Sequence, residues 1–219
     1  MNRLRQCAFV IAIACGSAIS AASASAHPHV WIGMKSEIIY SPDGSAKALR
    51  QAWQFDDIFS VFVTQGLKSK KKGEFTREEL APLAQLNIES LKEFDYFTVA
   101  KANGKNVTFA QPLDYYFEYE PKAAVLTLHF TLPFESPVLA KELQVSVYDQ
   151  TWYIDFGFVK NSPVRLVGAP AACKASVAGP AQMDPALMLR LSQLPADAQL
   201  DPSMFLGTQF ASKATVKCR

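Results

Sequence analysis

The sequence predicts an α+β fold: an antiparallel β-sheet or sandwich with two helices inserted after the second strand and a disulfide-tethered C-terminal tail. Three observations lead to this fold class. Apolar and polar side chains alternate in residues 30–40 and 49–55, apolar side chains take helical spacing in residues 58–94, and alternation resumes from Tyr96 to Val159. Strands, helices and strands are therefore expected in that order.

The first two strands are expected to form a hairpin. The apolar face of strand 30–40 consists of Val30, Ile32, Met34, Ile38 and Tyr40. The turn Ser41-Pro42-Asp43-Gly44 leads into the strand 49–55, which again presents apolar side chains to one face. Burial of both apolar faces on one side would set the pairing of the two strands.

Two helices are expected next. Asp56 or Asp57 caps a short helix that extends to Leu67. Thr76 and the glutamate three residues later form a capping box that begins a second helix, which continues to residue 94. Pro82 is expected to break or kink this helix near its start.

The later strands are predicted from turn signals between apolar runs. Asn103-Gly104 predicts a tight hairpin between residues 97–100 and 105–109. A Glu-Pro-Lys turn joins the strand 113–119 to the strand 124–134. Two further strands are expected at residues 142–148 and 152–159.

The C-terminal part has a different composition. Beyond Pro170, alanine, proline and small polar residues dominate, and Asp184-Pro185 predicts the start of a short helix over residues 186–194. The expected mature chain has only Cys173 and Cys218, so a single disulfide is expected to tie the tail to the body. Apart from this bond, the tail is expected to be peripheral.

The first 26 residues are expected to be a signal peptide. Arg3 and Arg5 supply a basic start, residues 7–19 are largely apolar, and small side chains occupy residues 21–26. The apolar run is shorter than the ~20 residues that cross a bilayer, so the mature protein is expected to be soluble and periplasmic. The predicted organisation is a signal peptide at 1–26, a core domain at 27–168 and a C-terminal extension at 169–219.

The processing site decides which metal ligands the N-terminus would offer. Cleavage after Ala26 would place the amine and ring of His27 beside His29, an arrangement that resembles a histidine brace. Cleavage after Ala24 would leave His27 as the third residue, where the amine, two amides and an imidazole suit square-planar Cu(II) or Ni(II). Lipidation at Cys15 is a third alternative, and it would remove the amine ligand.

Charge and motifs argue against several functions. Lys and Arg number 22 and Asp and Glu 20, and loss of two arginines with the leader makes these counts equal. The only basic run, Lys68–Lys72, is expected to be a solvated loop, so no nucleic-acid partner is expected. The sequence has no nucleophile elbow, zinc-protease motif or glycine-rich phosphate loop. We therefore expect neither an enzyme nor a nucleotide-binding protein.

Histidines and carboxylates suggest a metal site. His27 and His29 stand at the entrance of the first strand, and His129 lies on the polar face of the strand 124–134. Because all three histidines fall on strands of one predicted sheet, His129 is a candidate third ligand. The candidate carboxylates at strand ends are Asp56, Asp149 and Asp155, of which Asp56 also has a role as a helix cap.

Several motifs together resemble one family of exported bacterial proteins. They are Ala26-His27-Pro28-His29-Val30-Trp31-Ile32, Trp53-x-Phe55-Asp56-Asp57-x-Phe59, Tyr96-Phe97, Phe130-Thr131-Leu132-Pro133, Tyr148-Asp149-x-Thr151-x-Tyr153 and Val216-x-Cys218. Over nearly the whole mature chain, the sequence resembles the domain-of-unknown-function 1007 family, often described as the periplasmic component of an uncharacterised ABC-type transport system. Its members are commonly linked with nickel, cobalt or zinc transport, so the resemblance implies a metal-handling accessory role. The chain departs from the family pattern Asp-Pro-Thr-Tyr-Tyr at Gln150 and Trp152.

These observations predict a periplasmic accessory protein that binds zinc, nickel, cobalt or copper and passes the ion to or from a membrane metal transporter. The predicted metal ligands are His27, His29, His129, Asp149 and Asp56. One alternative is a scaffold or interaction subunit that holds a membrane transporter through aromatic side chains and binds no metal. Another is a copper oxidase that uses a histidine brace, which would need an open coordination position.

Overall fold

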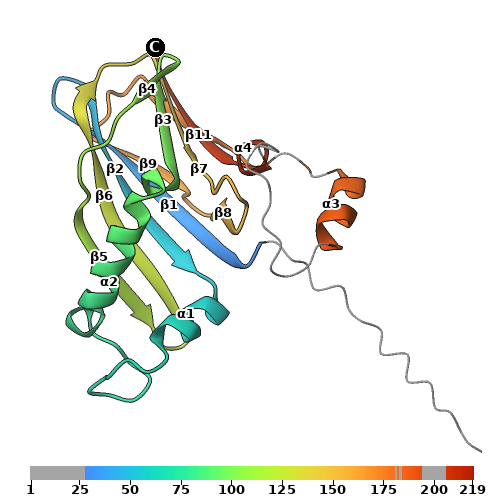
Figure 1. Cartoon of the computed structure of the whole chain (residues 1–219). Coiled ribbons are helices and arrows are strands. Elements are labelled where there is room, and N and C mark those ends of the chain that lie inside the picture. The colour runs from blue at the N-terminus through green and yellow to red at the C-terminus, as the bar shows by residue number, and fades with distance from the viewer. Residues whose placement is uncertain (1–27, 181, 183, 194–205) are drawn as a thin grey trace, which may run out of the picture.

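The computed structural model describes residues 28–180, 182, 184–193 and 206–219, and these form two facing β-sheets with helices alongside (Figure 1). The strands are β1 (Val30–Tyr40), β2 (Ala46–Phe55), β3 (Thr98–Ala102), β4 (Lys105–Val107), β5 (Leu113–Glu120), β6 (Val125–Val138), β7 (Glu142–Val147), β8 (Ile154–Phe158), β9 (Val164–Val167), β10 (Cys173–Ala178) and β11 (Ser212–Cys218). The helices are α1 (Asp57–Thr64), α2 (Arg77–Lys92), the short 3-10 helix η1 (Asp95–Phe97), α3 (Pro185–Ser192) and α4 (Leu206–Gln209). The predicted α+β class, with two helices after the second strand, is confirmed. The predicted signal peptide and His27 lie outside the described residues.

The first sheet has the order β5-β6-β2-β1, and both β8 and β9 pair with the other side of β1. β1 and β2 form the predicted antiparallel hairpin, with Ile38 opposite Leu49. By contrast, β8 and β9 run parallel to β1, which places Trp31 opposite Asp155. The sequence pattern did not indicate this parallel pairing because it joins segments that are far apart in the chain.

The second sheet has the order β10-β11-β7-β3-β4 and is antiparallel throughout. Its strand β11 comes from the C-terminal extension, and Ala214 and Val216 are buried in the core shared by both sheets. The expectation of a peripheral tail is therefore wrong. The predicted disulfide between Cys173 and Cys218 is present and joins β10 to β11.

The core between the sheets is centred on Trp53, which is fully buried and stands edge-on to Phe130 and Phe156 at centroid distances of 4.8 and 4.9 Å. Truncation of such a side chain to alanine typically costs about 3–5 kcal/mol. Successive side chains of a strand point to opposite faces of a sheet. The side chains that alternate with the buried residues of the first sheet therefore point away from the second sheet. We call the face of the first sheet that is turned away from the second sheet the outer face.

The helix α1 is fixed between the end of β2 and the edge of β6. Asp56 is its N-cap and accepts a hydrogen bond from the Phe59 N–H at 2.7 Å. Ser60 is buried and its hydroxyl oxygen accepts a hydrogen bond from the Leu126 N–H at 3.0 Å. The helix ends at Thr64, earlier than the predicted end at Leu67.

The helix α2 begins with the predicted capping box and packs along β5. Of the two outcomes predicted at Pro82, a break or a kink, the break does not occur, because α2 continues through this residue to Lys92. Proline removes one backbone hydrogen bond, and the buried side chains of Leu80, Ala84 and Ile88 hold the helix in place on both sides of it. Among the described residues, no helix is long and apolar enough to span a membrane.

Candidate functional site

His29 lies directly before β1, where this strand meets β8. Its backbone N–H donates to the Tyr153 carbonyl at 2.8 Å, and its ring lies against the Tyr153 ring with centroids 4.7 Å apart. The Val30 N–H approaches the same carbonyl at 3.3 Å. His29 is therefore part of the folded sheet, and its imidazole is held at the sheet edge.

Asp149 builds the turn that presents Tyr153 to His29. Its side chain is only 6% exposed, and its Oδ1 accepts hydrogen bonds from the N–H and the hydroxyl of Thr151, both at 2.8 Å. Its Oδ2 accepts from the N–H groups of Tyr153 and Ile154 at 3.0 and 3.1 Å. Because both carboxylate oxygens are engaged by four donors, the structure gives Asp149 a structural role beneath the predicted ligand His29.

Asp56 is engaged in the same way. Its Oδ1 caps α1, and its Oδ2 accepts a hydrogen bond from the Trp31 N–H at 2.9 Å. The Asp56 N–H also donates to the Trp31 carbonyl at 3.0 Å. The predicted capping role is thus confirmed, and the carboxylate ties the start of α1 to β1.

His129 lies on the outer face, as predicted, in the middle of a cross-strand row. Its ring stacks on Tyr116 with centroids 4.6 Å apart, and its Nε2 lies 3.2 Å from Glu118 Oε2, without the alignment of a hydrogen bond. The Arg77 guanidinium stands over the Tyr116 ring at 3.8 Å and lies 3.7 Å from Glu118. Burial lowers the pKa of His129; Glu118 opposes this shift and Arg77 adds to it.

The strand registers place His29 and His129 far apart. His129 is opposite Ala52, and Ala52 is opposite Lys35 on β1, which is six residues beyond His29. At ~3.3 Å per residue this is a separation of about 20 Å along the sheet, before two strand spacings are added. The structure therefore does not bring the two histidines to one ion. Among the described residues, no group of three or more His, Cys, Asp or Glu side chains could hold a metal ion.

The sequence profile described as "Protein of unknown function (DUF1007)" matches residues 11–218, which include both sheets and β11. The chain belongs to the DUF1007 family. A comparison with curated proteins finds no match. The resemblance predicted from the motifs is thus confirmed at the level of the family, whose description assigns no ligand or activity.

In this DUF1007 protein, Asp155 is the carboxylate best placed to act with His29. Asp155 is opposite Trp31 in the parallel pairing, so it points to the same face as Trp31 and, two residues earlier, His29. The spacing of residues and strands puts the Cα atoms of Asp155 and His29 about 8 Å apart. Burial raises the pKa of Asp155, and within the described part of the chain no hydrogen-bond donor or cation pairs with its carboxylate.

A separate shallow cavity of about 230 Å³ lies beside His129 on the outer face. The small residues Gly33 and Ala52 leave it open, and Gln54, Glu118 and His129 are among its polar lining. The sequence did not predict Glu118, because its meeting with His129 depends on the pairing of β5 with β6. The guanidinium of Arg77 supplies positive charge here, which makes this cavity less suited to a metal cation than the start of β1.

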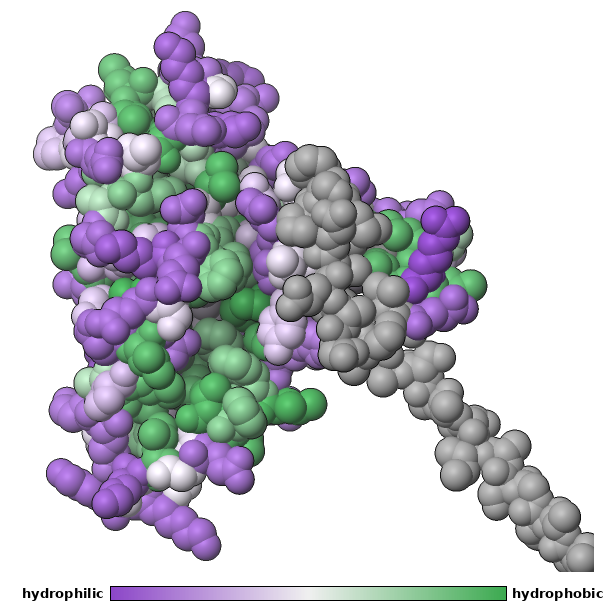
Figure 2. All heavy atoms as spheres, viewed as in Figure 1, coloured by the Kyte–Doolittle hydropathy of each residue, from purple (hydrophilic) through white to green (hydrophobic). Residues whose placement is uncertain are grey.

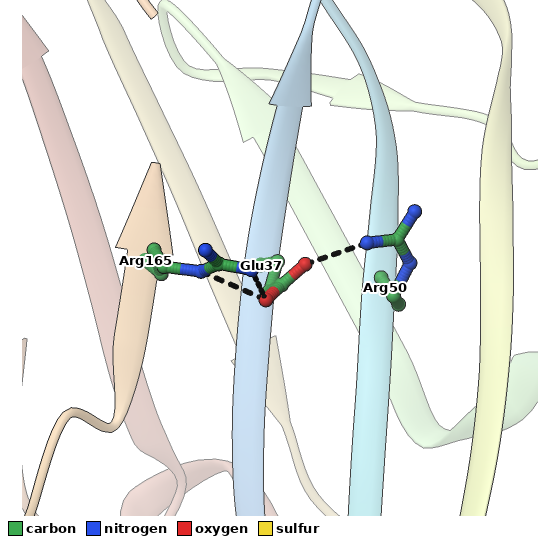
Figure 3. A network of polar contacts seen from close by, with 3 residues as sticks. All are labelled: Glu37, Arg50 and Arg165. Carbon is green, nitrogen blue, oxygen red and sulfur yellow. Dashed lines mark hydrogen bonds and ion pairs between the residues drawn. The ribbon is translucent and has the colours of Figure 1, made fainter. Parts of the chain in front are cut away.

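The next row of the outer face holds a three-strand ion-pair network (Figure 3). Glu37 on β1 accepts from Arg50 on β2 at 2.8 Å and from the Arg165 Nε on β9, also at 2.8 Å. Burial alone would raise the pKa of Glu37, but the bonds and charges of Arg165 and Arg50 outweigh it and lower that pKa. With both oxygens bound by arginine, Glu37 fastens β9, β1 and β2 together.

Proposed function

We propose that this DUF1007 protein is a periplasmic protein that binds a divalent transition-metal ion at the start of β1 and exchanges it with a membrane metal transporter. The observation that carries the proposal is the fixed imidazole of His29, directly after the segment whose processing would create a free amine. The Cys173–Cys218 disulfide favours an oxidising compartment and so supports export. The protein would bind and release its ion without catalysis.

The proposed ligands are His29, His27 or the new amine, and the Asp155 carboxylate. Imidazole and amine nitrogens with one carboxylate suit Zn²⁺, Ni²⁺, Co²⁺ and Cu²⁺. Asp149 would act as a positioning residue, because its four hydrogen bonds hold the turn on which Tyr153 and His29 rest. His129 is left out of the proposed set because it lies about 20 Å away along the sheet.

Titration of the metal-free mature protein tests the proposal. The protein is exported with its own leader, its N-terminus is identified by intact mass, and each ion is titrated in competition with a chromophoric chelator. We expect tighter binding than a His-Pro-His peptide shows, and a loss of at least about tenfold in affinity for His29→Ala. Asp155→Asn should weaken binding as well. His129→Ala is the matched control and should bind like the wild type.

Two results would overturn this assignment. One is binding no tighter than that of the peptide. The other is a His29→Ala variant with unchanged affinity, above all if the mass shows cleavage after Ala24 and the Cu(II) spectrum is square-planar. That second result would move the site to His27 alone.

The scaffold alternative is favoured by two exposed aromatic side chains at the same edge, Trp31 and Tyr153. If a transporter co-purifies with the protein equally well after His29→Ala and in the presence of a chelator, association does not depend on the ion. A Trp31→Ala variant that loses the transporter while it keeps metal affinity would then support the scaffold.

A further inference from the structure

The helix α1 is apolar on the side that faces solvent as well as on the side that packs on the sheets. Phe59 and Val63 pack against the core, whereas Ile58, Val61 and Phe62 are 77, 56 and 71% exposed. The outward face of a helix on a globular protein normally carries polar or charged side chains. A contiguous group of exposed apolar side chains marks a surface that meets a partner or a membrane.

The fold holds this apolar face outward. The Asp56 carboxylate fixes the start of α1, and the buried Ser60 binds the backbone of Leu126 on β6. Rotation of the helix to bury Ile58 and Phe62 would expose Ser60 and break both attachments. The exposure of these side chains is therefore a consequence of specific contacts that orient the helix.

A cluster of lysines follows the apolar face directly. The chain leaves α1 through the exposed Leu67 and enters Lys68–Lys72, whose four lysines are all exposed. Lys71 pairs with Glu74 at 2.6 Å, and in the described part of the chain the other three make no ion pair. Figure 2 shows hydrophobic side chains gathered over the α1 end of the molecule, with hydrophilic side chains at the tip beyond them.

We infer that α1 and the loop 65–73 dock on the surface of a bilayer that contains anionic phospholipids. The side chains of Ile58, Val61 and Phe62 would enter the boundary between headgroups and acyl chains, and the lysines would meet the lipid phosphates. The charge of the loop is what selects a lipid surface as the occupant, because an apolar face flanked by lysines is complementary to an anionic interface. This inference is independent of metal binding.

A tryptophan lies next to the same helix. The Trp31 N–H and carbonyl are both hydrogen bonded to Asp56, the cap of α1, and the side chain is 49% exposed. Tryptophan favours the headgroup level of a membrane because its ring is apolar and its N–H is polar. Trp31 would therefore add a residue suited to the membrane interface beside the start of α1.

Co-sedimentation with vesicles tests the inference on the full mature protein. Vesicles of phosphatidylethanolamine with phosphatidylglycerol should bind the protein, vesicles of phosphatidylcholine alone should bind it weakly, and added salt should release it. The double variant Ile58→Ser/Phe62→Ser should lose binding. Lys68→Gln/Lys70→Gln/Lys72→Gln should weaken it by about tenfold or more. Circular dichroism checks that each variant is folded, which is expected because the changed side chains are exposed.

Matched controls lie elsewhere on the surface. Leu139, in the connection between β6 and β7, is 77% exposed like Ile58, so Leu139→Ser removes an equally exposed apolar side chain without touching α1. Lys101→Gln/Lys105→Gln/Lys174→Gln removes the same charge from the second sheet. Both controls should bind vesicles like the wild type.

The inference fails if the wild type binds no vesicle, or if Ile58→Ser/Phe62→Ser binds as well as the wild type. It also fails if the control lysine variant loses as much binding as the loop variant, because binding would then depend on total charge alone. Sedimentation velocity adds one more outcome. A dimer that Ile58→Ser/Phe62→Ser dissociates would assign the face to a second copy of the chain and overturn the lipid assignment.

Discussion

Replacement of Asp149 separates a structural carboxylate from a metal ligand. The side chain is 6% exposed and accepts four hydrogen bonds, two on each oxygen, from Thr151, Tyr153 and Ile154. A hydrogen bond to a charged group contributes about 1.5–3 kcal/mol when its loss leaves a buried donor, and less where water can reach the donor. The turn is partly exposed, so we take about 1 kcal/mol for each bond. Asp149→Ala should then destabilise the protein by about 4 kcal/mol.

The isosteric variant Asp149→Asn sharpens this prediction. The asparagine oxygen would keep the bonds from the Tyr153 and Ile154 N–H groups if its NH₂ faces Thr151, whose hydroxyl can rotate to accept but whose N–H cannot. Asp149→Asn should therefore lose the charge and at least one bond, and should destabilise the protein by about 2 kcal/mol. Thr151→Val removes only the hydroxyl donor at the same carboxylate and should cost about 1 kcal/mol.

Urea unfolding followed by circular dichroism measures these differences on metal-free protein. If the free energy of unfolding of Asp149→Asn is within about 1 kcal/mol of the wild-type value, the four hydrogen bonds to Asp149 do not stabilise the turn as expected. If Asp149→Ala retains wild-type stability and loses metal affinity, Asp149 is a ligand, as the sequence alone suggested.

Three other perturbations have expected outcomes. Cys173→Ser/Cys218→Ser opens a loop with a sequence separation of 45 and should lower the free energy of unfolding by about 4 kcal/mol in the chain-entropy account, measured by urea unfolding. Because burial lowers the pKa of His129, the folded state favours the neutral ring. The contribution of the neutral ring to the free energy of unfolding is fully present above the unfolded pKa of about 6.5, and it is lost as the pH falls through the lower folded pKa. His129→Gln should remove this contribution to the pH dependence of stability, which unfolding curves at a series of pH values measure. Burial raises the pKa of Asp155, so Asp155→Asn should raise the melting temperature of the metal-free protein at neutral pH while it weakens metal binding.

Local patterns were enough to predict most elements. The alternation of apolar and polar side chains in Val30–Tyr40 predicts β1 with its observed bounds. One face of this strand is buried, and such a strand has apolar side chains at every second residue. Thr76 and Glu79 predict the start of α2, because each side chain accepts a hydrogen bond from the backbone N–H of the other residue. Asn103-Gly104 predicts its hairpin because both residues take positive φ there.

Features that depend on distant contacts were not predictable in this way. Residues 212–218 carry small and charged side chains with weak apolar character, yet β11 pairs with both β7 and β10 in the second sheet. The position of β11 depends on its pairing with these two strands, both of which lie far from it in the sequence. The neighbours of His129 likewise depend on the pairing of three strands.

One local signal in the sequence bears on the role predicted for Asp149. Asp149 is followed two residues later by Thr151, and an aspartate that accepts from a backbone N–H two residues on is a common turn device. This spacing favours a structural role for Asp149 over metal ligation. The sequence pattern could not show that Asp155 lies on the same face as Trp31, because this depends on the parallel pairing of β8 with β1.

The proposed metal site and the proposed membrane-docking surface lie along one continuous edge of the molecule. A combined test of both proposals is therefore possible. Trp31 is bonded on both its N–H and its carbonyl to Asp56, the cap of α1, and His29 lies only two residues before it. Docking of α1 on a bilayer would therefore hold the start of β1 close to the membrane surface.

In vitro the two functions should be independent: His29→Ala should bind vesicles normally, and Ile58→Ser/Phe62→Ser should keep its metal affinity. In cells that depend on metal transport, however, both variants should show the same defect, and combining them should add little. Additive defects in cells would show that membrane docking and metal exchange do not serve one process.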